Sequence, residues 1–291
     1  MKKTTTISSA RLLALLAGLA LASGAQAAAT WTFAGSSTVC TGEASNSGCT
    51  NAKTGTYSPS GSGATGTLNI AGYAAANGSN NTGFVSGSTS GKPNDSWTAQ
   101  TLTFWNNGNG VAMASDGITA PNHAIDNSGT NTEGVLLSFS TSQVLTSINL
   151  GYRSGDADIS VWRYTSTNNT APTATSTGAS YAEMVAAGWQ LVGNYGDLQT
   201  GNNSINSTGV GSSWWLITAY NSSYGAATSG TVNQGDDFFK IAAVSSNDCG
   251  STTSALCGKK TVAEPGSLAL AGLAIGGVFF SRRRKVVASV A

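Results

Sequence analysis

The sequence predicts an all-β protein, an antiparallel β-sandwich of jelly-roll type that carries one short helix. Short runs rich in β-branched and aromatic residues recur between clusters of glycine, serine and asparagine, which is the pattern of strands joined by turns. Residues 148–152 and 159–164 alternate apolar and polar side chains, as half-buried antiparallel strands do. Only one segment has a convincing helical pattern. Together these observations favour a sheet packed on a sheet.

Ten strands are expected along the chain. They are residues 30–34, 67–74, 97–105, 111–114, 134–140, 144–153, 158–165, 189–195, 213–220 and 238–244. The region before Ser96 has few large apolar side chains, so we expect an irregular lobe there. Most of the tryptophans fall in predicted strands, and core filling is favoured over ligand stacking for them because an indole buries a large apolar area. They include Trp105, Trp162, Trp189, Trp214 and Trp215.

The single predicted helix begins after Ser180. Ser180 with Glu183 three residues later has the spacing of a capping box, in which each side chain accepts from the other's main-chain N–H. Tyr181, Met184 and Val185 give the helix an apolar stripe on one side. Gly188 is placed to end the helix before the strand that starts at Trp189.

Residues 1–27 have the three parts of a secretory signal peptide. A cationic start precedes an apolar core over residues 12–22, and the small residues of Ala25-Gln26-Ala27 form a cleavage site. We expect export through the Sec translocon of a bacterium and cleavage by signal peptidase before Ala28. Residues 28–262 would then form one exported domain in an oxidising compartment.

The C-terminal segment combines a short motif, an apolar run and a cationic cluster. Ala263, Glu264 and Pro265 precede a predicted transmembrane helix over residues 266–281, and residues 286–291 form a cytoplasmic tail. At ~1.5 Å per residue this helix covers roughly 25 Å, near the lower limit for the ~30 Å hydrocarbon core. Temporary residence in the membrane is therefore favoured over an ordinary anchor or a buried core helix. The cations expected to stay on the cytoplasmic side are Arg282, Arg283, Arg284 and Lys285.

These three elements in this order resemble the PEP-CTERM sorting signal, although Ala263 stands where the common motif has its first proline. The resemblance implies processing near the motif by an exosortase, an integral-membrane enzyme. A second resemblance rests on segments between residues 122 and 244. They are Asn122-His123-Ala124-Ile125-Asp126-Asn127, residues 134–139, Asp156-Ala157-Asp158-Ile159, Gly188-Trp189, residues 192–195, Trp214-Trp215-Leu216-Ile217, Ala219-Tyr220 and Asp237-Phe238-Phe239-Lys240. With these segments the body resembles the exosortase-dependent surface protein family, whose molecular function is not assigned.

Four cysteines form two local pairs in the sequence. Four cysteines allow three connectivities, and proximity in an exported protein favours Cys40 with Cys49 and Cys249 with Cys257. A zinc site is the weaker interpretation, because neither pair has C-x-x-C spacing and His123 is the only histidine.

The charge of the body excludes one class of partner. Residues 28–262 hold seven Lys and Arg against twelve Asp and Glu, a net charge of about −5, while the whole chain is +1. The excess cations lie in the signal peptide and the C-terminal cluster. An acidic body with few cations argues against nucleic-acid binding.

The polar residues of the body favour binding over catalysis. A nucleophilic triad would depend on the single histidine, and no nucleophile-elbow motif is present. Asp156 with Asp158, or Asp236 with Asp237, could supply the paired carboxylates of a glycoside hydrolase, but neither spacing identifies a catalytic pair. No cofactor is expected unless Ca²⁺ binds near Asp126 or near Asp156 and Asp158, whose hard oxygens suit this ion. Solvated turn carboxylates are the alternative.

Three functions remain open from the sequence. The favoured one is a non-catalytic component of the cell surface or extracellular matrix, sorted by an exosortase and associated with exopolysaccharide. A carbohydrate-binding module and a polysaccharide-active enzyme are the alternatives.

Overall fold

The computed structural model describes residues 28–33, 44–45, 48–49, 54–58, 60–61, 66–77, 83–84, 95–105, 110–113, 121, 124–165, 171–172 and 178–249. This part of the chain is mostly antiparallel sheet and has one short α-helix, α2 (Tyr181–Ala186). The predicted signal peptide and transmembrane helix lie outside the described residues. Within those residues, no helix is long and apolar enough to cross a membrane.

One sheet of 13 strands dominates the structure, and β2 pairs with β3 in a separate small sheet. The main path runs β12-β11-β14-β10-β15-β8-β7, with further strands paired to β5, β10 and β15. The strands are β1 (Ala28–Thr32), β2 (Ala44–Ser45), β3 (Gly48–Cys49), β4 (Thr54–Tyr57), β5 (Leu68–Ala76), β6 (Thr98–Gln100), β7 (Leu102–Trp105), β8 (Gly110–Met113), β9 (Ile125–Asp126), β10 (Asn131–Arg153), β11 (Ile159–Tyr164), β12 (Trp189–Tyr195), β13 (Gly201–Ser204), β14 (Ser212–Ala219) and β15 (Phe238–Asp248).

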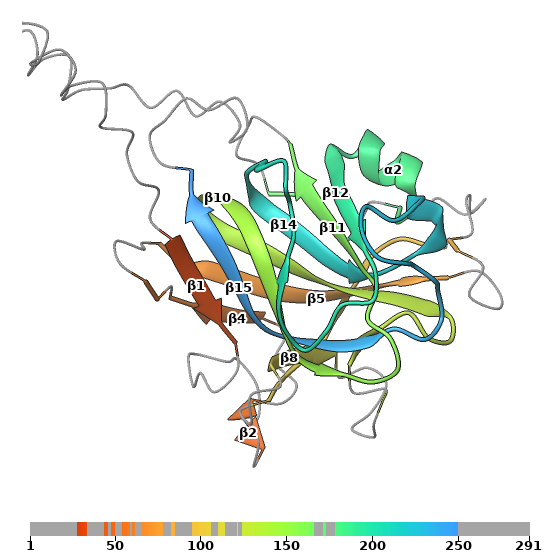
Figure 1. Ribbon diagram of the computed structural model, residues 1–291, viewed down its shortest axis with the longest axis horizontal. Coiled ribbons are helices and arrows are strands. Elements are labelled where there is room, and N and C mark those ends of the chain that lie inside the picture. The colour runs from red at the N-terminus through yellow and green to blue at the C-terminus, as the bar shows by residue number, and fades with distance from the viewer. Residues whose placement is uncertain are drawn as a thin grey trace, which may run out of the picture.

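The long strand β10 organises the sheet (Figure 1). Its first part pairs with β5 on one side and β14 on the other, and its second part pairs with β13 and β15. The sequence predicts two strands here, 134–140 and 144–153, and this prediction is wrong. The polar residues between them resemble a turn, but the strand continues through them with a register shift against β14 between Ser138 and Gln143.

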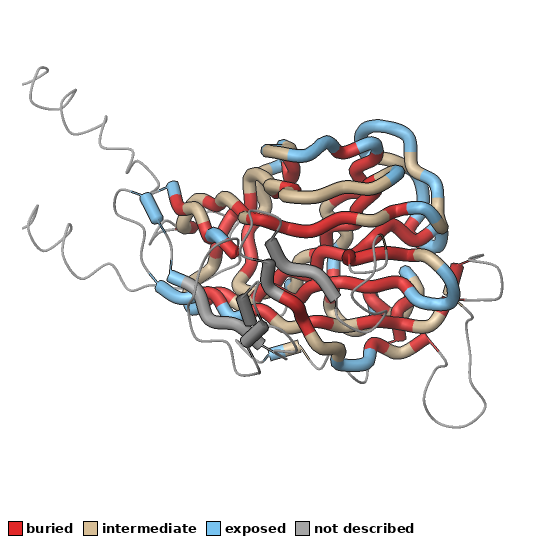
Figure 2. Tube along the Cα trace, turned by 90° about the horizontal axis from the view of Figure 1, so that it is seen from below, coloured by how far each residue is buried: buried red, intermediate tan, exposed pale blue. Residues whose placement is uncertain are grey.

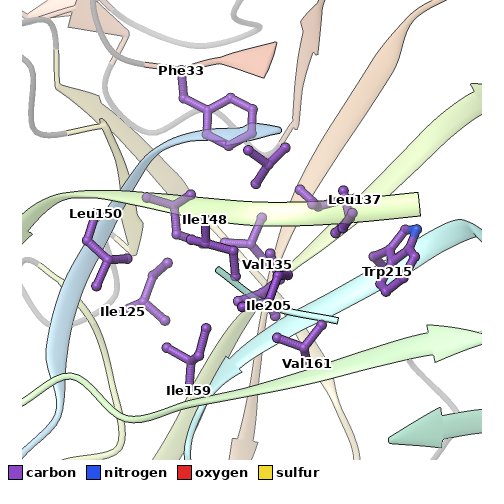
Figure 3. Packing of buried hydrophobic residues seen from close by; sticks show 14 of the residues in the cluster. Phe33, Ile125, Val135, Leu137, Ile148, Leu150, Ile159, Val161, Ile205 and Trp215 are labelled. Carbon is purple, nitrogen blue, oxygen red and sulfur yellow. The ribbon is translucent and has the colours of Figure 1, made fainter. Parts of the chain in front are cut away.

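The larger hydrophobic cluster draws on both parts of β10. Val135 and Leu137 come from the first part, and Ile148 and Leu150 from the second (Figure 3). All four are at most 1% exposed. Because alternate residues of a strand point to one face, each part contributes every second side chain to this cluster.

A second hydrophobic cluster covers the other face of the strands around β14. Leu136, Trp162 and Leu216 belong to this cluster and pack with Met184 of α2. The indole N–H of Trp97 donates to the sulfur of Met184 over 3.4 Å. The sheet is therefore apolar on both faces here, and burial is greatest along the middle of the strands (Figure 2).

The predicted ends of the helix are confirmed, but its capping box is wrong. The predicted apolar stripe is also wrong in part, because Met184 is buried while Tyr181 and Val185 are exposed. Ser180 is the N-cap residue, and Gly188 follows the helix with φ of +94°. The Ser180 side chain caps no main-chain N–H. Its hydroxyl instead donates to the Glu183 carboxylate over 2.5 Å, so the two side chains satisfy each other directly.

The other strand predictions differ mainly in their boundaries. The prediction of 189–195 matches β12, whereas the predicted strand 97–105 is divided into β6 and β7. The prediction of an irregular lobe before Ser96 is wrong, because β1, β4 and β5 belong to the main sheet. Five short strands, β2, β3, β4, β9 and β13, were not predicted, because none has an alternating apolar pattern of useful length.

Candidate metal centre

Three aspartates meet at one end of the sheet. Asp156 and Asp158 lie between β10 and β11, and Asp237 directly precedes β15. One oxygen from each carboxylate lies within 4.8 Å of the others. A parallel bridge between Asp156 and Asp237, together with main-chain bonds on both sides of it, brings the two segments together. We call Asp156, Asp158 and Asp237 the acidic triad.

Asp237 is the most enclosed member of the acidic triad. Its side chain is 0% exposed. One carboxylate oxygen, Oδ1, accepts from the main-chain N–H of Asp158 over 2.6 Å. The other, Oδ2, accepts from Nδ2 of Asn127. Both oxygens therefore bind groups from distant parts of the chain.

Asp158 is enclosed in the same way by two loops. It is 0% exposed, and its Oδ1 accepts from the N–H of Asp197 over 2.8 Å. Its Oδ2 accepts from the N–H of Asn233 over 2.7 Å. Asp197 has φ of +57°, a left-handed conformation that non-glycine residues rarely adopt. The Asp158 carboxylate thus orders the turns after β12 and before β15.

Asn127 completes the network with its amide group. Its Nδ2 donates to the carbonyl of Tyr220 over 2.8 Å as well as to Asp237. Its Oδ1 accepts from the N–H of Gly235 over 3.0 Å and from the N–H of Asp237 over 3.2 Å. Asn127 is 0% exposed. Its four hydrogen bonds connect the segment after β9 to the ends of β14 and β15.

Burial, and after it the proximity of the carboxylates, raises the pKa values of Asp158 and Asp237. Burial raises the pKa of Asp158 to about 6, and the negative charges of Asp156 and Asp197 add to this while N–H donors oppose it. Burial, followed by the charge of Asp158, raises the pKa of Asp237 to about 9. At neutral pH Asp237 therefore holds a proton unless a cation lies among the three carboxylates, since a cation would reverse these shifts.

The donor chemistry fits a hard cation. Calcium takes six to eight oxygen ligands at about 2.3–2.6 Å, and each carboxylate oxygen has a second lone pair besides the one used for an N–H bond. The same geometry also fits a proton shared among the three side chains. Calcium at Asp156 and Asp158 thus stays a prediction. Added calcium distinguishes the two occupants, because it stabilises a protein that binds the ion and does not stabilise one that holds a shared proton instead.

Asp126 lies outside this group. Its Oδ1 accepts from the N–H and from the hydroxyl of Ser128, both over 2.9 Å, and its carboxylate is not one of the three that cluster. The structure therefore divides the predicted calcium ligands, with Asp156 and Asp158 together and Asp126 apart. Asp237 was not among the predicted calcium ligands. The sequence pointed to it only as a possible catalytic carboxylate with Asp236 and as part of the segment Asp237-Phe238-Phe239-Lys240.

Most other predicted site residues lie outside the described part of the chain. These are Ala25 and Ala27, the motif 263–265, the cationic cluster 282–285, Cys40 and Cys257. Ala28, the predicted first residue of the mature protein, is the first residue of β1. Cys249 is 4% exposed and is not a free thiol, and its pairing with Cys257 stays a prediction.

No protein-family model, no curated protein and no solved structure matches this chain.

Proposed function

We propose that this chain is an exported, non-catalytic protein of the cell surface or extracellular matrix, sorted and processed by an exosortase and associated with exopolysaccharide. The observation that carries the proposal is the order of motif, short apolar run and cationic cluster over residues 263–285. The signal peptide features of residues 1–27 support it, because both segments address the chain to a membrane.

The acidic triad supports a structural role for the body. A catalytic carboxylate has to come within hydrogen-bonding reach of the proton or atom on which it acts. Asp158 and Asp237 are 0% exposed, and each binds protein N–H groups with both oxygens. Their contacts join loops to strands and favour a scaffold over a hydrolytic site.

The jelly-roll arrangement is part of the proposal. Its support is the larger hydrophobic cluster, in which side chains from the first part of β10, β11 and β14 pack with those from the second part of β10 and β15. Two parts of one large sheet that share a core in this way are typical of sandwich folds.

The intact mass of the protein from the surface and from the medium tests the proposal. We expect the chain to begin at Ala28 and to end near Glu264 and Pro265. An Ala263→Pro variant, which restores the common motif, should increase the processed fraction, and an Arg282–Arg284→Ala variant should decrease it. Retention of residues 268–291 in all the surface protein would reduce the tail to an ordinary anchor and overturn the proposal.

A carbohydrate-binding module is the second candidate, and one observation favours it. Trp214, for which the sequence predicted a core position, is only partly buried and packs at the margin of the second hydrophobic cluster. Partly exposed tryptophans can present their ring faces to a ligand.

A further inference from the structure

Five adjacent strands place one residue each in a continuous row on the face that carries the second hydrophobic cluster. Tyr164 pairs with Trp189 of β12, and Ser138 of β10 pairs with Trp214 of β14 and with Asn69 of β5. The pairing of Arg163 with Trp215 places Tyr164 of β11 opposite Trp214. We call Trp189, Tyr164, Trp214, Ser138 and Asn69 the aromatic ledge.

The ledge has aromatic side chains at one end and small polar side chains at the other. Trp189 is buried, Tyr164, Trp214 and Ser138 are partly buried, and Asn69 is exposed. With strands about 4.8 Å apart, a row across five strands is roughly 19 Å long. The row is therefore extended, and it crosses β12, β11, β14, β10 and β5 in that order (Figure 1).

Two polar groups on the ledge are available to a ligand. In the described part of the chain, neither the Tyr164 hydroxyl nor the Trp214 indole N–H bonds to protein, and neither is a buried atom without a partner. The indole N–H groups of Trp31 and Trp215, in contrast, donate to Ser246 and to the carbonyl of Ser212. A tyrosine and a tryptophan that each keep a polar group accessible are suited to binding a ligand with both apolar and polar surfaces.

The aromatic rings are held in place before any ligand arrives. The centroid of the Tyr164 ring lies 5.3 Å from that of Trp189 and 6.0 Å from that of Trp214, and the last pair is edge-to-face at 88°. The Ser212 hydroxyl donates to the carbonyl of Tyr164 over 2.6 Å and accepts from the N–H of Trp214 over 3.1 Å. A preorganised surface loses little conformational entropy on binding.

We propose that the aromatic ledge binds an extended, neutral chain of the exopolysaccharide. The inference rests on the proposed surface location and names the ligand class. The C–H faces of sugar rings would pack on Trp214 and Tyr164, and sugar hydroxyls would bond with the two free aromatic groups and with Ser138 and Asn69. No side chain of the ledge is charged, and the body has a net charge of about −5, so a polyanion would be repelled.

Affinity measurements with protein isolated from the producing cells test this assignment. The probes are the neutral polysaccharide fraction of those cells, hydroxyethyl cellulose as a neutral soluble chain, and alginate as a polyanion. We expect retardation in gels that contain the neutral fraction and none with alginate. Trp214→Ala and Tyr164→Ala should each weaken binding by about tenfold or more, while Trp214→Phe should keep part of the affinity because it retains a ring.

Tyr73→Ala is the matched control. Tyr73 is partly buried in the same cluster, but it pairs with Gly134 of β10, four positions along the strand from Ser138. Affinity within twofold of the unchanged protein is expected for this variant. Circular dichroism and thermal melting confirm that each variant is folded.

Three results would overturn the ledge assignment. They are no binding to any neutral polysaccharide, equal binding by the Trp214→Ala and control variants, and binding only to alginate in a salt-sensitive manner. Concentration-dependent self-association that Trp214→Ala abolishes, without polysaccharide binding, would assign the ledge to a second copy of the chain. Export and C-terminal processing are measured separately by mass, so failure of the ledge assignment is distinct from failure of the sorting proposal.

Discussion

The main-chain N–H of Asp158 donates to the carboxylate of Asp237 over 2.6 Å, although 79 positions separate the two residues in the chain. This bond holds the start of β11 against the start of β15 and places a second carboxylate, that of Asp158, beside the first. The stability of this end of the sheet therefore depends on what neutralises the two charges.

Replacement of Asp156 distinguishes a cation from a shared proton. Asp156→Asn keeps an acceptor for the N–H of Ala157, a bond of 2.8 Å, and removes a charge that raises the pKa of Asp158 and Asp237. In EDTA at about pH 8 we expect the variant to melt a few degrees higher than the unchanged protein, because it has less repulsion between carboxylates. In a domain of this size, 1 kcal/mol of stability corresponds to roughly 2–4 °C in melting temperature.

Added calcium should reverse that order. If the ion binds, it stabilises the unchanged protein by mass action and has little effect on Asp156→Asn. Asp236→Asn is the control, because Asp236 is exposed and, among the described residues, its side chain bonds only Nδ2 of Asn233 over 3.3 Å. Equal melting temperatures in EDTA and in excess calcium, for the unchanged protein, would remove the metal from this site.

The pH dependence of stability follows from three raised pKa values. Asp158 and Asp95 have pKa values of about 6 and Asp237 of about 9, so the folded protein retains protons that the unfolded chain releases near pH 4. The stability from these groups is complete below about pH 4 and is lost as pH rises through 6 towards 9.

We therefore expect the melting temperature in EDTA to fall between about pH 5 and about pH 8. Above this window burial of Lys240, which lowers its pKa to about 8, acts in the opposite direction. A melting temperature that rises steadily across the window would contradict the raised pKa values.

Asn127 should be among the most sensitive polar positions of the body. Asn127→Ala leaves the N–H groups of Gly235 and Asp237 and the Asp237 carboxylate without this partner. We expect a loss of roughly 2–4 kcal/mol in the free energy of unfolding, because each unsatisfied buried group costs about 1–3 kcal/mol. Urea unfolding measures the loss. Asn233→Ala is the control with an expected effect under about 0.5 kcal/mol, since the Asn233 side chain is exposed and its main chain makes the bond to Asp158.

A second pair of carboxyl groups lies beside the helix. Asp95 is 0% exposed, and burial followed by the negative charge of Glu183 raises its pKa to about 6. Asp95→Asn removes the repulsion and adds a donor for Glu183. The variant should be more stable than the unchanged protein at about pH 7.5 and nearly equal at about pH 4.5. A gain that is the same at both pH values would exclude the carboxyl pair as its cause.

Local patterns predicted a useful part of the fold. The strand-like run 189–195 between turn residues predicted the bounds of β12, and Ser180 and Gly188 marked the helix ends, because each of these signals acts over a few neighbouring residues. The break at 140–144 was misleading. A polar stretch resembles a turn when read alone, but pairing of β10 with its neighbours keeps it extended.

The sequence by itself determined the net charge of residues 28–262, the β class and the position of the helix, and the addressing segments stay predictions. Only the tertiary structure decided that Asp237 joins Asp156 and Asp158 and that Trp214 lies in a row with Tyr164. The physical reason is that strand pairing sets both relationships. Which residues face each other depends on register between segments distant in the chain, and a shift of one residue would move every side chain to the opposite face.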